Sequence, residues 1–446
     1  MKENDIIKLN ITDYDSEGLG IAHYENKPVF VDNALPGEVI KARITRITKN
    51  LVFADNLEIL ESSSEREYNI CPYYKTCGGC NIMHMKYNLQ LKYKTDLVKR
   101  TIHKISGFDP KVNDCIPNPN PYEYRNKIIV PFGEENGEII SGFYEAKSHK
   151  IVKSNGCMIE PSISRDIISY IKDLIKKYKI EVYKESKNKG IIRNVMLRVS
   201  SYNKIMVVLV ATKYLPEFKN MAIDINNKFK DCISIYLNIN DKMTNVVLQD
   251  DYRLLFGERY LVENINGLLF NVHPNSFLQI NHKQCENLYQ KAINYANIKE
   301  SDVVLDAYCG IGSISLNIAK HAKFVYGIEV VKEAVDNALG NMKLNNITNA
   351  DFYCGKCEDL IENLVKDKHI DVIVFDPPRK GCDKKFLDTV IKSGIKKIVY
   401  ISCKTSTFAR DIKILCDNGY KILEVTPFDL FSHSIHTECC GVLIKE

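Results

Sequence analysis

A cysteine near the C-terminal end of the chain stands where a buried parallel strand is expected to end. Residues 398–402 are mostly apolar and lead into Cys403, and a helix-like stretch follows from residue 407. In open α/β sheets, ligands bind at the carboxyl ends of the strands. A cysteine there can act as a nucleophile, but cysteines are also common as small buried hydrophobic residues. The position alone leaves both interpretations open.

A glycine turn upstream predicts a bound ligand that contains a ribose. Residues 303–307 form a predicted buried strand, and Gly310 and Gly312 precede a helix, so the backbone can approach a ligand closely. Glu329 ends the next predicted strand, nineteen residues after Gly310, which suits hydrogen bonds to two ribose hydroxyls. A dinucleotide fingerprint would have a third glycine in place of Ser315. The turn therefore favours S-adenosylmethionine over NAD.

The third predicted strand begins at residue 371 and ends in a carboxylate. It leads into Asp376-Pro377-Pro378-Arg379, where two prolines fix the backbone and hold Asp376 toward the cofactor. Asp306, beside the glycine turn, is acceptable because S-adenosylmethionine has no pyrophosphate. Methyltransferases that act on amino groups have an aromatic residue after the two prolines, which clamps a flipped base. Arg379 at that position argues against a planar amine as the target.

Three further cysteines have a spacing that predicts a metal site. Cys71, Cys77 and Cys80 follow a C-x5-C-x2-C pattern, and a Gly-Gly turn lets the last two sulfurs face one point. An iron–sulfur cluster or a structural zinc needs four thiolates, and Cys157, in a turn-like sequence, is preferred to Cys115 as the fourth. Radical enzymes that cleave S-adenosylmethionine have a first gap of three residues, so a gap of five argues against that chemistry. The spacing leaves iron–sulfur and zinc both open.

Length and composition predict a cytoplasmic protein of several domains. A chain of 446 residues is too long for one core. No stretch approaches the length of a membrane span, and the first residues show no signal-peptide pattern. Fifteen cysteines in a reducing compartment favour metal or catalytic roles over disulfides. The net charge of +5 permits nucleic-acid binding without requiring it. We expect a monomer that does not bind membranes.

Strand and helix patterns divide this α/β multidomain chain into three parts. Residues 1–62 show short strands separated by turns, which predicts a small β-barrel. Residues 63–265 predict an α+β middle domain that contains the cysteines, a lysine-rich amphipathic helix at 86–105 and, among other strands, one at 245–248. Residues 266–446 alternate between strands and helices, as expected for a Rossmann-like catalytic domain.

Several features favour RNA as the partner. Gly18-Leu19-Gly20-Ile21-Ala22, followed by Phe30-Val31 and Leu35-Pro36-Gly37-Glu38, resembles a TRAM domain, an RNA-binding barrel of the oligonucleotide-binding type. The barrel is acidic overall, so any RNA contact there must use its basic strand at 39–49. Positive charge is concentrated at 71–120, where tyrosines could stack on unpaired bases. A barrel that only packs against the rest of the protein is the alternative.

Together these motifs resemble the RNA uracil-5-methyltransferase family over essentially the whole chain. The likeness rests on the cysteine triplet, the glycine turn, Asp376-Pro377-Pro378-Arg379-Lys380-Gly381, Ser402-Cys403 and His436-Thr437-Glu438. It is closest to the branch that has a TRAM barrel and an iron–sulfur cluster and modifies 23S ribosomal RNA. The resemblance implies a class I S-adenosylmethionine-dependent enzyme that makes 5-methyluridine. It also implies that the helix at 86–105 can pack on the catalytic domain.

The resemblance further assigns roles to particular residues. It implies cofactor contacts at the glycine turn and its neighbours, and a [4Fe-4S] cluster held by four cysteines. The cofactor set is Gln279, Asp306, Tyr308, Gly310, Gly312, Ser313, Glu329 and Asp376, and the cluster set is Cys71, Cys77, Cys80 and Cys157. Tyr308, Ser313 and Lys404 depart from the phenylalanine, asparagine and asparagine usual in the family.

The residues suit this chemistry independently. Carbon 5 of uracil is a weak nucleophile until a thiolate adds to carbon 6 and converts the ring into an enolate. We predict that Cys403 supplies the thiolate and that Glu438 removes the carbon-5 proton after methyl transfer. His433 and His436 are alternative bases. Cys309, in the glycine turn, is an alternative nucleophile that we expect to be a packing residue.

Three other functions compete with this prediction. The same reaction on transfer RNA is the nearest, although the usual enzyme of that type lacks the barrel and the cysteine cluster. A cytosine-5 methyltransferase of the familiar RNA type would have a second cysteine in a P-C-S loop, where this chain has Asp376-Pro377-Pro378. An RNA-binding iron–sulfur protein without catalysis would not need Cys403, Glu438 and Asp376 together.

Overall fold

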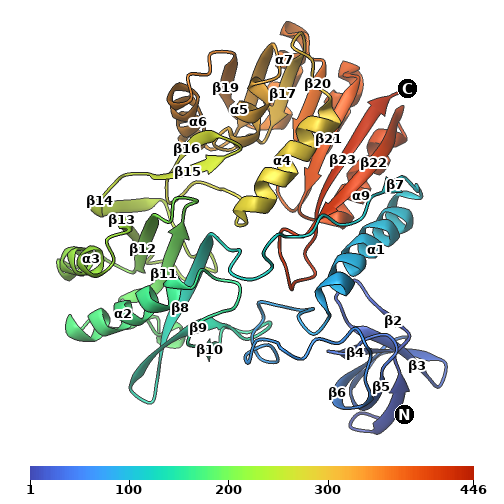
Figure 1. The fold of residues 1–446 in the computed structure, drawn as a ribbon, viewed down its shortest axis with the longest axis vertical. Coiled ribbons are helices and arrows are strands. Elements are labelled where there is room, and N and C mark those ends of the chain that lie inside the picture. The colour runs from blue at the N-terminus through green and yellow to red at the C-terminus, as the bar shows by residue number, and fades with distance from the viewer.

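The N-terminal strands fold into a small barrel at one end of the molecule (Figure 1). The structure is a computed structural model that describes residues 1–446. Apolar and polar residues alternate along β1 and β5, so one face of the sheet closes over its own core. The strands are β1 (Ile6–Asn10), β2 (Asp13–Tyr14), β3 (Gly20–Tyr24), β4 (Lys27–Asp32), β5 (Val39–Ile47) and β6 (Val52–Glu61), in the order β1-β5-β6-β4-β3-β2.

A buried ion pair joins the barrel to the chain that follows it. The Glu38 carboxylate, in the turn predicted at residues 35–38, accepts the Leu35 N–H at 2.9 Å. It also accepts two hydrogen bonds from the Arg66 guanidinium, at 2.5 Å from Nε and 2.8 Å from Nη2. Both side chains are almost completely buried. Because a buried charge without its partner is costly, this pair fixes the direction in which the chain leaves the barrel.

The middle unit is a seven-stranded sheet that shares one core with the helices α2 (Ile163–Lys177) and α3 (Glu217–Lys228). Every residue of the central strand β12 is buried, so its sequence is a continuous apolar run. The strands are β8 (Lys127–Glu135), β9 (Glu138–Tyr144), β10 (Ile151–Lys153), β11 (Ile192–Val199), β12 (Ile205–Ala211), β13 (Cys232–Ile239) and β14 (Asp251–Gly257), in the order β10-β9-β8-β11-β12-β13-β14, and a short 3-10 helix spans Glu185–Lys187.

The strand predicted at 245–248 is absent, because a side-chain amide holds this segment in place of a backbone ladder. The Asn240 Nδ2 group donates to the carbonyl oxygens of Val246 and Val247, at 3.0 and 2.8 Å. The edge of the sheet is formed instead by β14, which pairs antiparallel with β13. The apolar run at 245–248 predicted a strand, but sequence patterning could not reveal that the hydrogen-bond partner of this segment is the Asn240 side chain.

The C-terminal unit is an eight-stranded sheet covered by helices on both faces (Figure 1). One core packs α4, α5 and α6 against the sheet, and a second packs α1, α7, α8 and α9 against the other face. The strand order is β19-β18-β17-β20-β21-β23-β22-β7. Its strands and helices in the C-terminal half are α4 (His282–Ala296), β17 (Val303–Ala307), α5 (Ser313–Ala319), β18 (Phe324–Glu329), α6 (Lys332–Leu344), β19 (Ala350–Cys354), α7 (Cys357–Asp367), β20 (Val372–Phe375), α8 (Lys384–Ser393), β21 (Lys397–Ser402), α9 (Thr405–Cys416), β22 (Tyr420–Phe428) and β23 (Glu438–Lys445). None of the helices of the protein is both long and apolar enough to cross a membrane.

The helix predicted at 86–105 lies in the catalytic unit. It forms α1 (Tyr87–Ser106), which runs along α9 and buries Val98 in the catalytic core. The short strand that follows, β7 (Lys111–Val112), pairs in parallel with β22 at the edge of the catalytic sheet. The domain predicted at 63–265 is therefore not one continuous unit, because the chain completes part of the catalytic unit before it builds the middle sheet.

The chain returns to the catalytic unit earlier than predicted. The strands β15 (Leu261–Ile265) and β16 (Leu268–Val272) form a hairpin, whose Phe270 side chain belongs to the same core as α4. The middle sheet ends with β14, at Gly257. The boundary predicted between residues 265 and 266 lies inside this hairpin, because local strand patterning does not reveal which core a strand joins.

Candidate active site

Three strand ends bring together the predicted nucleophile, the predicted base and Asp376. Strand β21 ends at Ser402, and Cys403 follows at the carboxyl edge of the sheet. On one side lies β20, which ends just before Asp376. On the other side β23 runs antiparallel and pairs Cys439 with Ser402, so Glu438, the first residue of β23, lies next to Cys403. Residues distant in sequence meet here because of the strand order.

Burial controls the charge of these side chains. Burial raises the pKa of the Cys403 thiol to about 12, the carboxylates of Glu438 and Asp376 add to the shift, and Arg379 opposes it. Burial also raises the pKa of Glu438 well above its usual range, and Asp376 raises it further. Neither carboxylate oxygen of Glu438 has a hydrogen-bond partner, although the residue is only 1% exposed. In the free protein, burial therefore favours the protonated form of both groups, and a cationic ligand nearby would favour their ionised forms.

The glycine turn leaves open space against the backbone beside these strand ends. Gly310 has a φ of 55°, and a Cβ atom placed on it would meet nothing within 4 Å. Gly312 is also left-handed, with a φ of 79°, and a Cβ atom there would lie 3.0 Å from the Phe352 ring. Glu329 ends β18 and accepts the Gly310 N–H at 3.1 Å through Oε2. The turn thus has room for a ligand next to an acidic strand end.

Asp306 is a buried carboxylate with one unpaired oxygen near the turn. Its Oδ2 atom accepts a 2.5 Å hydrogen bond from Ser315 Oγ, whereas Oδ1 has no partner. Burial raises its pKa to about 7. Gln279 and Asp376 form a second, partly buried polar contact, with 3.5 Å between Nε2 and Oδ2. The sequence did not predict that Ser315 donates to Asp306. Its spacing identifies Ser315 only as the position where a dinucleotide fingerprint has a glycine.

Two predicted cofactor contacts are engaged within the protein. The Tyr308 ring packs on Phe386, with 5.6 Å between ring centroids. The Ser313 Oγ atom lies 2.8 Å from the Tyr289 hydroxyl. Open space at Gly310 and the unpaired oxygen of Asp306 nevertheless fit a ligand with N–H and O–H donors. S-adenosylmethionine has both, in its ammonium group and its ribose hydroxyls.

Cys403 opens into a groove between the barrel and the catalytic unit. The barrel contributes its loop at residues 14–17 and the Phe30 ring, and α1 forms one wall. The charged residues of the groove are Arg100, Lys104, Arg379 and Lys404 on the basic side and Asp15 and Glu17 on the acidic side. An excess of basic side chains beside an aromatic ring suits a single-stranded nucleic acid.

The four cysteines predicted to bind metal line one small pocket. Burial raises the pKa of the Cys80 thiol to about 12 and that of Cys157 to about 11, and neighbouring thiols raise each further. Cys71 and Cys77 complete the set, and all four are free thiols. No group of three or more His, Cys, Asp or Glu residues in the structure is arranged to hold a metal ion. The structure brings the predicted ligands together without forming a metal site.

The surroundings of these thiols fit an anionic, thiolate-bound group. Arg125 lines the same pocket, and its buried Nε atom has no hydrogen-bond partner. Thiolates at Cys80 and Cys157, as in a metal-bound group, would place negative charge beside this guanidinium and stabilise it. Cys115, the alternative fourth ligand, lies outside this pocket and is buried where its N–H donates to Thr95 Oγ1.

The alternative catalytic residues have different surroundings. His436 lies in the groove with Cys403, and its Nδ1 atom is 3.4 Å from Nη2 of Arg379. His433 is buried and contacts Gln90 instead. Cys309 is buried beside the glycine turn, and burial raises its pKa well above the usual range. Sequence reasoning missed Gln90; its only signal is a polar residue on the apolar face of α1.

Fold and site together define a class I methyltransferase that uses S-adenosylmethionine. The sequence profile of the tRNA (uracil-5-)-methyltransferase family matches residues 86–446, and that of the TRAM domain matches residues 2–57. The chain therefore belongs to the tRNA (uracil-5-)-methyltransferase family. The predicted TRAM barrel and Rossmann-like catalytic domain are confirmed.

Related proteins extend over the whole chain. One RNA methyltransferase of Oceanobacillus iheyensis, described as uncharacterized, is 41% identical over 99% of this chain and 97% of its own length. Another, of Clostridium tetani, is 38% identical over 98% and 96%. Among solved structures, the tRNA (uracil-54, C5)-methyltransferase of Pyrococcus abyssi in complex with S-adenosyl-L-homocysteine matches with a TM-score of 0.79 and 27% identity, over 98% of this chain and all of that one.

The charges around Cys403 predict how fast it reacts with iodoacetamide. The thiolate is the reactive form of a cysteine. Because the pKa of Cys403 is about 12, only a small fraction is thiolate at pH 8. This fraction rises about tenfold when the pH rises by one unit or when the pKa falls by one unit. Glu438→Gln removes a carboxyl group whose ionised form raises the pKa of the Cys403 thiol, and it is expected to speed alkylation at pH 8. Arg379→Met removes positive charge and is expected to slow it. Peptide mass spectrometry measures both rates, and the exposed Cys354 serves as the internal reference. Equal Cys403 rates in all three proteins would contradict the electrostatic account.

Proposed function

We propose that this protein methylates carbon 5 of uridine in RNA through a covalent bond between Cys403 and carbon 6 of the ring. The observation that carries the proposal is the position of Cys403 beside Glu438 across the β21–β23 pair, with Asp376 at the neighbouring strand end. S-adenosylmethionine supplies the methyl group when it is bound. One chain supplies the nucleophile, the base and the groove, so we propose that it acts as a monomer, in the cytoplasm.

The reaction needs a thiolate first and a base afterwards. When the Cys403 thiolate adds to carbon 6, the electrons of the 5,6 double bond move into an enolate, and carbon 5 becomes nucleophilic and takes the methyl group. The proton on carbon 5 must then leave so that the double bond re-forms and expels the thiolate. Glu438 takes this proton. Burial makes its carboxylate a stronger base than one in water, because burial disfavours the charged form.

RNA reaches Cys403, in this proposal, along the groove between the barrel and α1. Arg100 and Lys104 on α1 are placed to neutralise phosphates on one side, and Arg379 and Lys404 flank the nucleophile on the other. Phe30, which stacks on a second barrel phenylalanine with 5.6 Å between centroids, offers a surface for an unpaired base. The barrel therefore contributes to RNA binding through this local surface, although it is acidic overall.

RNA that carries 5-fluorouridine is expected to trap the enzyme. Fluorine on carbon 5 cannot be removed as a proton, so the methylated adduct persists. A denaturing gel of labelled RNA is expected to show an adduct that needs S-adenosylmethionine and disappears in Cys403→Ala. Glu438→Gln keeps the nucleophile but lacks the base. It is expected to accumulate a methylated adduct on ordinary uridine, with turnover reduced by about 10²- to 10⁴-fold.

A control variant and two contradicting results complete the trapping experiment. Cys416→Ala, at the end of α9, is the matched control and is expected to leave the adduct unchanged. A full-strength adduct in Cys403→Ala would assign the nucleophile to another cysteine, with Cys309 the first to test. Normal turnover in Glu438→Gln would move the base to His436, His433 or water.

We propose 23S ribosomal RNA as the substrate and transfer RNA as the second candidate. The combination of a TRAM barrel with four gathered cysteines supports the first, because it resembles the branch that modifies 23S RNA. The Pyrococcus abyssi protein favours the second, since its name places its reaction at uracil 54 of tRNA. Its similarity covers 98% of this chain, so the barrel alone does not separate the two substrates.

Mapping of 5-methyluridine in a strain that lacks this protein separates the two substrates. Loss of the modification from 23S ribosomal RNA, with transfer RNA unchanged, is expected. The purified protein is then expected to methylate unmodified 23S RNA from that strain, because the missing uridine is available there. Loss at position 54 of transfer RNA alone would establish the second candidate instead.

We further propose that Cys71, Cys77, Cys80 and Cys157 hold a [4Fe-4S] cluster. Their common pocket and the unpaired Nε of Arg125 support this assignment, since thiolates and cluster together carry negative charge. Cys71, Cys77 and Cys80 precede helix α1, and Cys157 follows strand β10 of the middle sheet. When bound, the cluster would therefore join the segment before α1 to the middle unit. It has no proposed part in the transfer of the methyl group.

The cluster gives the purified protein an expected colour and stability. Protein prepared without oxygen is expected to be brown, with broad absorption near about 400 nm, and to contain iron. Cys157→Ser is expected to lose the colour and to unfold at lower temperature, because one ligand is gone, while S-adenosylmethionine still binds. Cys115→Ser, outside the pocket, is the control and is expected to keep its iron. One zinc and no iron in the wild type would overturn the cluster.

A further inference from the structure

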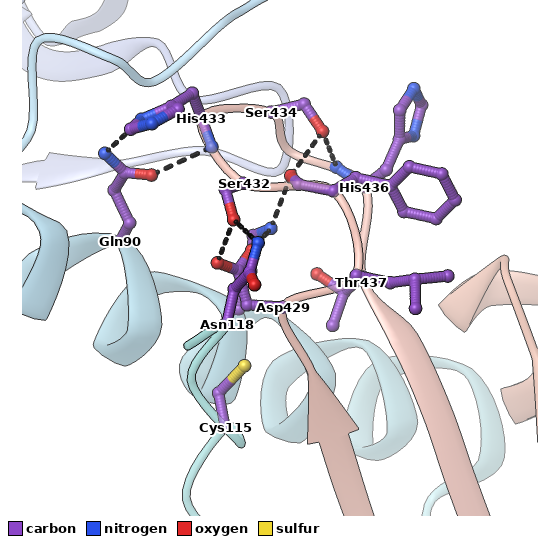
Figure 2. Close-up of polar contacts among 12 residues, drawn as sticks. Gln90, Cys115, Asn118, Asp429, Ser432, His433, Ser434, His436 and Thr437 are labelled. Atoms are coloured by element: carbon purple, nitrogen blue, oxygen red, sulfur yellow. Dashed lines mark hydrogen bonds and ion pairs between the residues drawn. The ribbon is translucent and has the colours of Figure 1, made fainter. Parts of the chain in front are cut away.

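The loop that leads into Glu438 is buried although it is rich in polar residues. It spans residues 429–437, between β22 and β23, and Figure 2 shows His433 turned toward Gln90 of α1 and Ser432 turned toward Asp429. Asp429 and Ser432 are 0% exposed, and His433 is 2% exposed. Because Phe428 pairs directly with Glu438 across the two strands, the loop closes on the predicted base. Its conformation therefore decides how Glu438 enters the active site.

A fully buried ion pair fixes the first part of this loop to α1. The Lys94 Nζ atom lies 2.5 Å from Oδ1 of Asp429, and both side chains are completely buried. Lys94 also donates to the Phe431 carbonyl oxygen at 2.9 Å. The second Asp429 oxygen accepts hydrogen bonds from the Tyr87 hydroxyl at 2.7 Å and from Ser432 Oγ at 2.6 Å. Every polar atom of the pair is therefore used to hold the loop.

A second contact fixes the middle of the loop. Gln90, one helical turn before Lys94, accepts the His433 N–H at 3.1 Å through Oε1, and its Nε2 atom lies 3.2 Å from Nδ1 of the same histidine (Figure 2). His433 has a φ of 67°, a left-handed conformation that is costly for a residue with a side chain. The two-point contact holds the backbone in this conformation.

We propose that Lys94 and Gln90 are positioning residues for the methylation reaction, which hold the loop at 429–437 so that Glu438 meets the carbon-5 proton. This inference rests on the proposed function, because it gives both residues a part in the same reaction. Neither lines the groove of Cys403; they act through Asp429 and His433. Cys403 itself is held by β21 and α9, so its addition to carbon 6 does not depend on this loop.

A purely stabilising role explains the pair less well. Taking a lysine and an aspartate out of water is costly, and apolar residues of similar volume often pack as stably as a buried ion pair. Hydrogen bonds, unlike apolar contacts, are directional and hold one geometry. Lys94 and Gln90 lie on the same face of α1 and contact the loop at two points, Asp429 and His433. Two separate contacts fix the orientation of the loop relative to α1, which a single contact would not.

Single-turnover reactions with unmodified uridine RNA test this role. They give the ratio of covalent enzyme–RNA adduct to released methylated product, which does not depend on how much enzyme is folded. A misplaced base slows proton removal but not adduct formation. We expect the ratio to rise about ten- to a hundredfold in Lys94→Met and in Gln90→Leu, as expected when a reacting group is displaced by about 1 Å. Lys92→Met, exposed on the same helix, is the control and is expected to leave the ratio unchanged.

Gln90→Leu keeps the test decisive if Lys94→Met fails to fold, because it leaves no buried charge unpaired. Hydrogen–deuterium exchange of the loop at 429–437 gives a second readout and is expected to increase in Gln90→Leu only near this loop. An unchanged adduct ratio in folded Gln90→Leu, with normal methylation by the wild type, overturns the positioning role alone. A wild-type enzyme that forms neither adduct nor 5-methyluridine overturns the proposed function itself.

Discussion

The antiparallel pairing of β23 with β21 is the constraint on which the active site depends. In a purely parallel sheet, the carboxyl ends of neighbouring strands lie at one edge and their amino ends at the other. Because β23 runs in the opposite direction, its first residue lies at the same edge as the last residue of β21. Glu438 thus stands beside Cys403, and the loop before β23 must fold over that edge. The hydrogen bonds between two central strands therefore set the distance between the proposed nucleophile and the proposed base.

Three carboxyl groups gather at the same edge of the sheet, where ionising all of them is costly without a positive ligand. Asp306 and Glu438 are buried and retain carboxylate oxygens without partners, and Asp376 is partly buried. Burial raises the pKa of each. Folding pays for this arrangement with lost carboxylate solvation, and a cationic methyl donor is the natural counter-charge. Binding of a positive ligand at Asp376 also favours the thiolate of Cys403, since that carboxylate is one cause of its raised pKa. In the proposed mechanism, these charges would couple cofactor binding to activation of Cys403.

Sequence alone predicted the parts of this site that follow from local patterns. A strand, a glycine turn and an acidic strand end are read from adjacent residues, so Gly310 and Glu329 were found at the edge where the structure has them. The strand at 245–248 was wrong because its partner is a side chain, Asn240, rather than another strand. The predicted domain limits differ from the structure because β7 pairs with β22 in the catalytic sheet and the apolar face of α1 joins a core formed from the far end of the chain. Patterns identify elements, but contacts between distant elements decide their grouping.

The backbone of His433 is where the distant parts of the chain meet. Its N–H is held by Gln90 of α1, its carbonyl oxygen accepts the N–H groups of Asn81 and Ile82 at 2.9 and 3.1 Å, and the Tyr122 ring lies 4.8 Å from its own. Asn81 directly follows Cys80, so the cysteine segment contacts the catalytic loop through the backbone. Such bonds are directional, and the conformations of the two segments therefore constrain each other. The thiol pocket therefore adjoins the segment that holds the loop before Glu438, and a change in this pocket is transmitted to that loop through backbone hydrogen bonds.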